Sequence, residues 1–254
     1  MDRLAFNAVA AITQQAVSRQ VTANELANVS TPGFKRSYDV ALRGIKAEGA
    51  GMETRIQPQA MSTDRIKLRP GPFMATGRDL DIALNEQSVM GVQTADGKLA
   101  FTRRGDLSIN AQGVLENGAG HPVRSENGGT LTVPTGSDIR IAPDGTLFAK
   151  DPLQPAAPET QVGRLLLRDA SQVGLERRED GLFRLEGAPD GADITNGKTP
   201  PSLTAKALEG SNVNAMEVMI KLMDQARSFE QQVRIIKESK SGDEAGASML
   251  KLGS

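Results

Sequence analysis

The chain has 254 residues, with 30 Lys and Arg against 31 Asp and Glu, one His, and neither Cys nor Trp. Lack of Cys excludes disulfides, thiolate metal sites and Cys nucleophiles, and a single His leaves no His pair for zinc or non-haem iron. A formal charge of −1 argues against nucleic acid as a partner, and 3% aromatic residues argue against a deep small-molecule pocket or a bound cofactor.

An apolar stripe marks the N-terminal region as a helix. Its members recur at spacings of four and three, the pattern of a helix that packs against another helix. They are Ala5, Val9, Ile12, Ala16, Ala23 and Leu26, and Arg19 occupies the remaining position of this spacing. The helix should stop at Thr31-Pro32-Gly33, because Pro disfavours helix at the preceding residue and Gly permits a turn. Asn7 interrupts the apolar run and no small-residue cleavage site follows, so we expect no cleaved secretory leader.

Two carboxylates stand out at the start of the middle region. Asp79 and Asp81 are two residues apart and would share a strand face, and paired carboxylates can perform acid–base chemistry or bind cations. Leu80 and Ile82 would line the opposite face. We interpret the two aspartates as a solvated strand face and expect no metal site.

Short strands separated by glycine turns fill the rest of the middle region. Residues 89–94 and 99–103 flank Asp96-Gly97, whose Gly supplies the positive φ of a tight hairpin turn. Further strands are expected within residues 108–115, 139–141, 146–148, 162–168 and 181–186. This succession favours an antiparallel β domain over βαβ units.

Two motifs of the middle region resemble catalytic or binding sites without meeting their requirements. Residues 192–199 fit a loose phosphate-loop pattern, which needs a strand before it and a helix directly after it. Pro200-Pro201 follows instead and disfavours helix, so we expect no nucleotide binding. His121 lies in Gly-Ala-Gly-His-Pro, a turn context without the held orientation of a catalytic His. We therefore expect no catalytic residues.

A second apolar stripe marks the C-terminal region as a helix. Ser211 or Asn212 is expected to cap it. The stripe consists of Ala215, Met219, Leu222, Ala226, Phe229, Val233 and Ile236. An isolated helix of this length is marginal in water, so each terminal helix needs the other or a neighbouring chain. The two stripes are therefore the expected assembly interface.

These elements predict an α+β protein. Its N- and C-terminal heptad helices would form a coiled-coil-like α domain, and its centre would be an antiparallel β-rich domain. The expected boundaries are 1–30 and 211–254 for the helical assembly domain, 31–75 and 202–210 for linking or extended β segments, and 76–201 for the β-rich domain.

The segment from Asn24 to Lys35 resembles the signature of the bacterial flagellar axial proteins, which form the rod and hook. The signature residues here are Asn24, Leu26, Ala27, Asn28, Thr31, Pro32, Gly33 and Phe34. Residues 208–214 and 226–231 resemble the C-terminal part of that family, and residues 76–83 and 101–105 its β domain. The resemblance covers essentially the whole chain, with its motifs in order.

Within this family the chain is most similar to proximal rod proteins. Distal rod and hook proteins usually carry Gly-x-Gly-Phe-Phe after Leu-Asp-x-Ala, where this chain reads Asn85-Glu-Gln-Ser-Val-Met90. A distal rod protein is the alternative within the family. The length excludes the larger hook subunit and the shorter rod proteins that lack a β domain.

The resemblance implies a structural subunit with no enzymatic activity. It implies export, unfolded and uncleaved, through the flagellar type III apparatus, and then assembly with other proximal and distal rod proteins into a periplasmic drive shaft that transmits motor torque. The terminal helices would form the inner layer of this tube and the β domain the outside. Asn28 to Lys35 would form the junction that bends from helix into β structure. No membrane insertion and no nucleic-acid partner are implied.

Two function classes outside the family stay open at this point. A carboxylate-dependent hydrolase with a β core could use Asp79 and Asp81, but the scarcity of His and aromatic residues argues against it. A soluble adhesin-like binding module would not explain heptad stripes at both ends.

Overall fold

The computed structural model divides into two compact units. The helical unit comprises residues 1–27, 39–63 and 214–254, and the β unit comprises residues 28–38 and 64–213. The structure describes the backbone of residues 2–37, 41–46, 56–61, 65–134, 136–154, 158–195 and 197–251. Within these, the side chains of residues 2–10, 14, 41–46, 56–61, 239, 243, 246, 247 and 249–251 lie outside the description.

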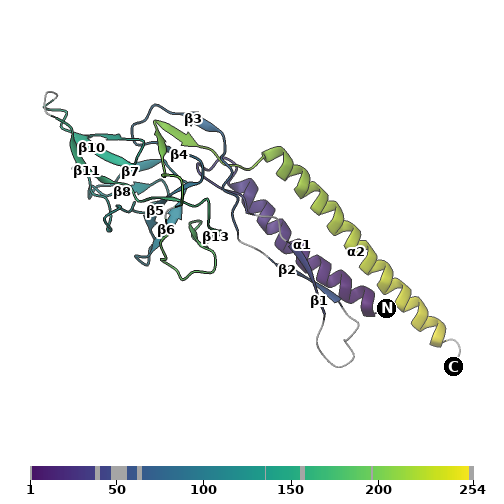
Figure 1. Ribbon diagram of the computed structural model, residues 1–254. Coiled ribbons are helices and arrows are strands. Elements are labelled where there is room, and N and C mark those ends of the chain that lie inside the picture. Colours follow the sequence, from purple (N-terminus) through teal and green to yellow (C-terminus); the bar gives the residue numbers. More distant parts are fainter. Residues whose placement is uncertain are drawn as a thin grey trace. The chain divides into compact units, whose positions relative to one another are not determined.

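The described part of the helical unit consists of two long helices and one pair of strands (Figure 1). Helix α1 spans Asp2–Ala27 and α2 spans Ala215–Lys251. Strands β1 (Ala41–Lys46) and β2 (Ile56–Met61) pair in antiparallel fashion. Neither described helix is apolar over a stretch long enough to cross a bilayer.

Asn214, rather than Ser211 or Asn212, caps α2. Its Oδ1 accepts hydrogen bonds from the amides of Met216 at 3.0 Å and Glu217 at 3.3 Å, which satisfies two of the free N–H groups of the first turn. The expected caps are engaged elsewhere. Ser211 Oγ accepts from the Val213 amide, and Asn212 Oδ1 accepts from the Arg36 amide. The predicted cap was therefore wrong by a few residues.

Short antiparallel strands build the β unit. They are β3 (Phe73–Ala75), β4 (Ile82–Leu84), β5 (Ser88–Gln93), β6 (Leu99–Thr102), β7 (Leu107–Ile109), β8 (Leu115–Asn117), β9 (Asp138–Ile141), β10 (Thr146–Lys150), β11 (Thr160–Arg164), β12 (Leu167–Asp169), β13 (Leu175–Arg177), β14 (Phe183–Leu185), β15 (Leu203–Ala205) and β16 (Ala207–Glu209). A five-stranded sheet has the order β12-β5-β6-β14-β13, and a three-stranded sheet has the order β11-β10-β9. The pairs β15–β4, β16–β3 and β7–β8 complete the unit.

Glycine turns close the hairpins where the sequence predicts them. Gly97, between β5 and β6, has a φ of 76°, and Gly145, between β9 and β10, has a φ of 86°. Gly113, between β7 and β8, has a φ of 78°. A side chain at these positions would be strained, because the left-handed region is open mainly to Gly. The prediction of a central antiparallel β region between two terminal helices is confirmed.

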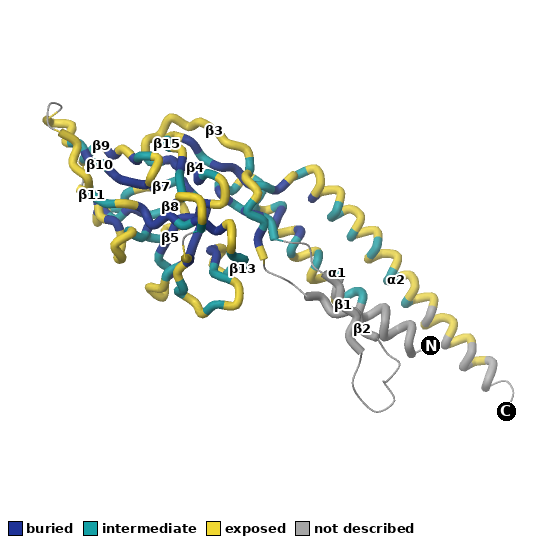
Figure 2. The backbone as a smooth tube through the Cα atoms, viewed as in Figure 1, coloured by how far each residue is buried: buried dark blue, intermediate teal, exposed yellow. Residues whose placement is uncertain are grey.

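The core of the β unit lies on both faces of the five-stranded sheet. Met90 and Val92 of β5 belong to the larger apolar cluster, whereas Val89 of β5 and Phe101 of β6 belong to a second one. Alternate residues of a strand point to opposite faces, so both faces are covered. Figure 2 shows these buried strands in dark blue and most of α2 as exposed.

Asp81 does not lie on a solvated face. Its residue is 4% exposed and its carboxylate pairs with Arg78 at 3.0 Å, whereas Asp79 is exposed and pairs with Lys206 at 2.8 Å. An antiparallel bridge from Asp81 to Asp106 covers the backbone next to β4. The interpretation of both aspartates as solvated was therefore wrong for Asp81.

Candidate assembly interface

The flagellar-type signature forms the turn that follows α1. Asn24, Leu26 and Ala27 lie in the last turns of α1, and the signature residues from Asn28 onward belong to the β unit. The Thr31 amide donates to the Asn28 carbonyl at 3.2 Å and the Thr31 hydroxyl reaches Asn28 Oδ1 at 3.1 Å. Residues that bond one another at this spacing form a tight, hydrogen-bonded turn.

Gly33 is required in this turn by close packing. It has a φ of 69°, and a Cβ there would lie 2.3 Å from the carbonyl oxygen of Arg103. The Gly33 amide donates to the Glu209 carbonyl at 2.7 Å. The signature turn is thus fixed against two distant segments of the β unit, which explains why no other residue fits here.

Phe34, the signature residue after Gly33, is held in place by an aromatic contact. The guanidinium of Arg177 lies 4.2 Å from the centre of the Phe34 ring, a cation–π distance. Arg177 also donates to the Lys35 carbonyl, and the Asn212 amide donates to the Phe34 carbonyl at 3.2 Å. These contacts hold the chain that follows α1 beside the chain that precedes α2.

Three charged side chains meet in the interior of the β unit. Lys35 Nζ lies 2.5 Å from Glu209 Oε1, and Arg103 Nε lies 2.7 Å from Glu209 Oε2. All three side chains have no exposed surface. We call these residues the ionic cluster. Buried charges are stable only when paired and hydrogen-bonded, and Glu209 supplies the single negative charge here.

Backbone groups complete the hydrogen bonding of the ionic cluster. Arg103 donates to the carbonyls of Glu86 at 2.8 Å, Ser88 at 2.7 Å and Leu84 at 2.5 Å. Lys35 also donates to the Arg69 carbonyl at 3.1 Å, and the Gly71 amide donates to Glu209 Oε1 at 3.0 Å. These bonds connect segments from both ends of the β unit.

Burial lowers the pKa of Lys35. Its removal from water, followed by the positive charge of Arg103, lowers the pKa of Lys35 from an ordinary 10.5 to about 8, although Glu209 acts in the opposite direction. The segment from Asn24 to Lys35 that resembles the family signature contains this lysine, but the sequence did not predict the cluster. Arg103 and Glu209 lie in the segments 101–105 and 208–214, and nothing local in either segment indicates that they meet.

Polar side chains form the contact between α1 and α2. Gln225 Nε2 donates to Ser18 Oγ at 2.9 Å and to Thr22 Oγ1 at 3.2 Å, and Gln15 Nε2 donates to the Gln225 carbonyl. Thr22 is fully buried. We call these residues the polar seam. The contact between the helices of one chain thus includes amides and hydroxyls, and the Arg19 guanidinium of α1 also lies 5.7 Å from the centre of the Phe229 ring of α2.

The predicted stripe residues are only partly covered within one chain. Ile12, Leu26, Ala215, Leu222, Val233 and Ile236 are half-buried, while Ala16, Ala23, Met219, Ala226 and Phe229 are exposed. The side chains of Ala5 and Val9 lie outside the described residues. Val218, which the stripe omits, is fully buried.

An exposed apolar face runs along the first turns of α2. Met216 is 69% exposed, Met219 49%, Ile220 57% and Met223 57%. Residues three, four and seven apart share one side of a helix. We call this set the methionine face. A contiguous apolar patch of this kind marks a protein-interaction site, and methionine adapts well to a partner surface.

No chemical site competes with this interface in the described part of the chain. No group of three or more His, Cys, Asp or Glu among the described residues could hold a metal ion. The described parts of residues 192–199 are loop, with no helix after them. His121 belongs to the turn after β8, where its amide donates to Asn117 Oδ1 at 3.0 Å.

Comparisons with known proteins identify the class. A model named Flagellar hook protein FlgE/F/G D1 domain matches residues 84–149, and one named Flagellar basal body rod FlgEFG protein C-terminal matches residues 204–249. The chain is 39% identical to flagellar basal-body rod protein FlgF of Escherichia coli K12 over 248 residues, covering 97% of this chain and 96% of that protein. It is 39% identical to FlgF of Salmonella typhimurium LT2, covering 93% of each chain.

A more distant relative is flagellar basal-body rod protein FlgG of Agrobacterium fabrum, with 30% identity over 93% of this chain and 94% of the relative. The fold and these matches define an axial structural protein of the bacterial flagellum, not an enzyme. The chain belongs to the flagellar rod and hook FlgE/F/G family and is a structural subunit of the basal-body rod. Its identity to the two FlgF proteins supports a proximal rod protein.

Proposed function

We propose that the apolar stripes of α1 and α2 pack against the helices of neighbouring rod subunits. The interface would comprise Ala5, Val9, Ile12, Ala16, Ala23, Leu26, Ala215, Met219, Leu222, Ala226, Phe229, Val233 and Ile236. The single observation that carries this proposal is the separation of surfaces on α2. Its polar seam contacts α1 of the same chain, while its methionine face is exposed.

The energetics favour neighbours as the source of the missing burial. A large apolar side chain contributes about 1.5–3 kcal/mol when fully buried, and the exposed side chains of α2 do not gain this in one chain. Ordering a helix costs about 1–2 kcal/mol per residue in backbone entropy. Neighbouring subunits would supply the remaining contacts in a coiled-coil-like arrangement with the β unit outside. We retain 1–30 with 211–254 as the assembly domain, 76–201 as the β-rich domain, and 31–75 with 202–210 as linking or extended β segments.

Met219→Glu tests this proposal, because Met219 is 49% exposed in the single chain and a charge there would disturb only a contact with another subunit. We expect the variant to be lost from purified basal bodies and swimming to stop, with the melting of the β unit unchanged. Gln231→Glu, at an exposed polar position of the same helix, is the matched control and should assemble normally. Normal incorporation of Met219→Glu would contradict the proposal.

We further propose that the chain reaches the periplasmic rod unfolded, through the flagellar type III apparatus, and without cleavage. The lack of Cys supports this route, because no disulfide could block passage of the chain. Mass spectrometry of the protein from purified basal bodies should find the chain starting at Met1 or Asp2. A start at residue 15 or later would exclude this route.

A further inference from the structure

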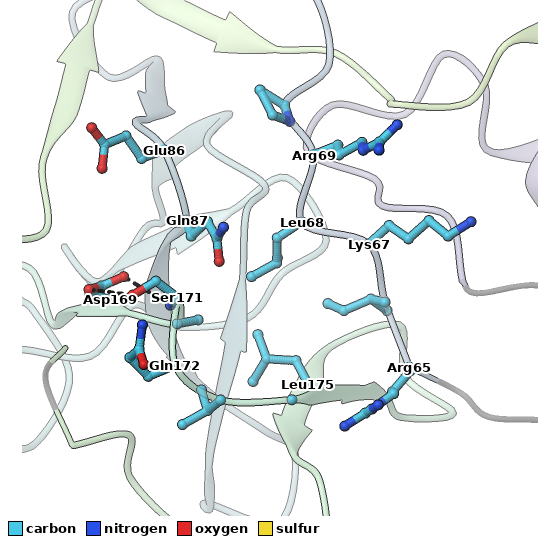
Figure 3. Close-up of a pocket in the computed structure, with 15 residues that line it drawn as sticks. Arg65, Lys67, Leu68, Arg69, Glu86, Gln87, Asp169, Ser171, Gln172 and Leu175 are labelled. Carbon is cyan, nitrogen blue, oxygen red and sulfur yellow. Dashed lines mark hydrogen bonds between the residues drawn. The ribbon is translucent and has the colours of Figure 1, made fainter. Parts of the chain in front are cut away.

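A groove of about 950 Å³ opens in the β unit between residues 65–70 and 169–175. Figure 3 shows Leu68 and Leu175 directed into it from opposite sides, with Gln87 at the rim. Ile66 and Leu175 are buried at its base, and Leu68 and Val173 are partly covered by the same apolar cluster. The groove therefore has an apolar base that the described residues of the β unit do not fill.

The walls of the groove are fixed before any partner arrives. On one side, the Ile66 amide donates to the Leu175 carbonyl at 2.9 Å. On the other, the Ala170 amide donates to the Gln87 carbonyl at 3.0 Å, and Arg103 holds the Glu86 carbonyl at 2.8 Å. A preformed groove loses little conformational entropy on binding, which favours association.

An exposed apolar side chain is presented elsewhere in the same unit. Leu153, in the turn between β10 and β11, is 89% exposed, more than any other large apolar side chain in the described part of the chain. The turn is built to hold it outward. Asp151 Oδ1 accepts from the Leu153 amide at 2.9 Å, and the Asp151 carbonyl accepts from the Gln154 amide at 3.1 Å.

The leucine and the groove cannot meet within one chain. Figure 1 shows β10 and β11, which flank Leu153 in the sequence, at the side of the β unit away from β13, which begins at the groove. We propose that Leu153 of one copy inserts into the groove of a second copy. The two surfaces differ, so this contact is head-to-tail and does not close on itself.

Charge favours the same pairing. Arg65, Lys67 and Arg69 lie at alternate positions along one wall of the groove, whereas Glu86 and Asp169 line the opposite side (Figure 3), so only the first wall is basic. Arg65 pairs with Glu186 at 2.5 Å, while Arg69 is exposed with no ion pair among the described residues. The carboxylate of Asp151, two residues before the inserted leucine, would approach this basic wall. Complementary charge orients two proteins as they meet.

This proposal rests on the proposed function in one respect: copies of this chain must lie side by side in a rod. The chain has no Cys, so two introduced thiols report one contact without background. Leu153→Cys with Val173→Cys, oxidised in purified basal bodies, should give a ladder of dimers, trimers and larger species on a non-reducing gel. Each single variant can give a dimer at most.

Leu153→Cys with Asn127→Cys is the matched control, because Asn127 is exposed in the β unit and does not line the groove. It should give no ladder. A missing ladder from the Leu153 and Val173 pair, in basal bodies that hold this variant at the wild-type level, would overturn the groove contact and leave the helix interface standing. An equal ladder from the control pair would overturn it too.

Leu153→Asp provides an independent readout, since the exposed side chain contributes nothing to the fold of one chain. We expect at least a tenfold loss of incorporation, whereas Leu153→Met should assemble as the natural chain does. Wild-type incorporation of Leu153→Asp would also overturn the proposal.

Discussion

At the scale of single residues, the ionic cluster is the least expected feature of this protein. Lys35 and Glu209 are 174 residues apart, and Arg103, the residue directly after β6, joins them. Glu209 pairs with two buried cations and also accepts a hydrogen bond from the Gly71 amide. The cluster ties the segments that lead out of α1 and into α2 to the same point of the β unit.

Glu209→Gln should therefore be strongly destabilising. It keeps the shape but leaves Lys35 and Arg103 buried without a negative partner, and breaking a buried ion pair costs about 3–5 kcal/mol. Denaturant unfolding of the β unit measures this loss. Glu176→Gln is the control, because Glu176 pairs with Arg184 at 3.3 Å near the surface, where an ion pair contributes about 0–1 kcal/mol. Equal losses in the two variants would contradict the assignment.

Lys35 should also make stability depend on pH. Its pKa falls from 10.5 to about 8 in the folded chain, so between these values the unfolded chain holds more protons. The contribution of Lys35 to the free energy of unfolding then rises with pH across this window. Lys35→Met removes this pH-dependent contribution and leaves Arg103 paired with Glu209. The free energy of unfolding of the natural chain, minus that of the variant, should rise by up to about 1.4 kcal/mol per pH unit between pH 8 and 10.5. A constant difference across this range would refute the lowered pKa.

At the scale of elements, the helices α1 and α2 are less buried by their own chain than the central strands are. Their contact includes the polar seam, in which the amide oxygens of Gln15 and Gln225 are buried with no hydrogen-bond partner among the described residues. Such unmet acceptors weaken a contact. By contrast, β5 is buried along almost its whole length.

Hydrogen exchange on the free monomer should show this difference. Amides of residues 5–26 and 215–240 should exchange at least a hundredfold faster than those of residues 89–103, because local opening is easiest where few apolar groups are buried. Sedimentation at the same concentration confirms the monomer. Equal protection of the helices and the strands would mean that the helices are stable without neighbours.

At the scale of the whole molecule, stability rests on the β unit and helix-mediated assembly on the helical unit. The β unit holds both apolar clusters and the ionic cluster, whereas the helical unit carries the methionine face. A structural subunit of the basal-body rod needs both properties. A folded unit gives rigidity, and an exposed helix gives an apolar surface that is buried, and so contributes to stability, only in the polymer.

The sequence by itself determined the local features. The glycine turns at Gly97 and Gly145, the end of α1 before Pro32 and the two terminal helices follow from neighbouring residues alone, because turn and helix preferences act over a few positions. The signature from Asn24 to Phe34 likewise indicated the flagellar family directly.

Tertiary structure alone decided the rest. Spacings of three and four do not tell which side of α2 meets α1, so the buried Val218 was missed beside the exposed Met219. Asn214 became the cap because Asn212 is bound to Arg36. The ionic cluster joins residues far apart in the chain, and no local pattern records such a pairing. Burial of charge is decided by where distant segments meet, and that is a property of the fold.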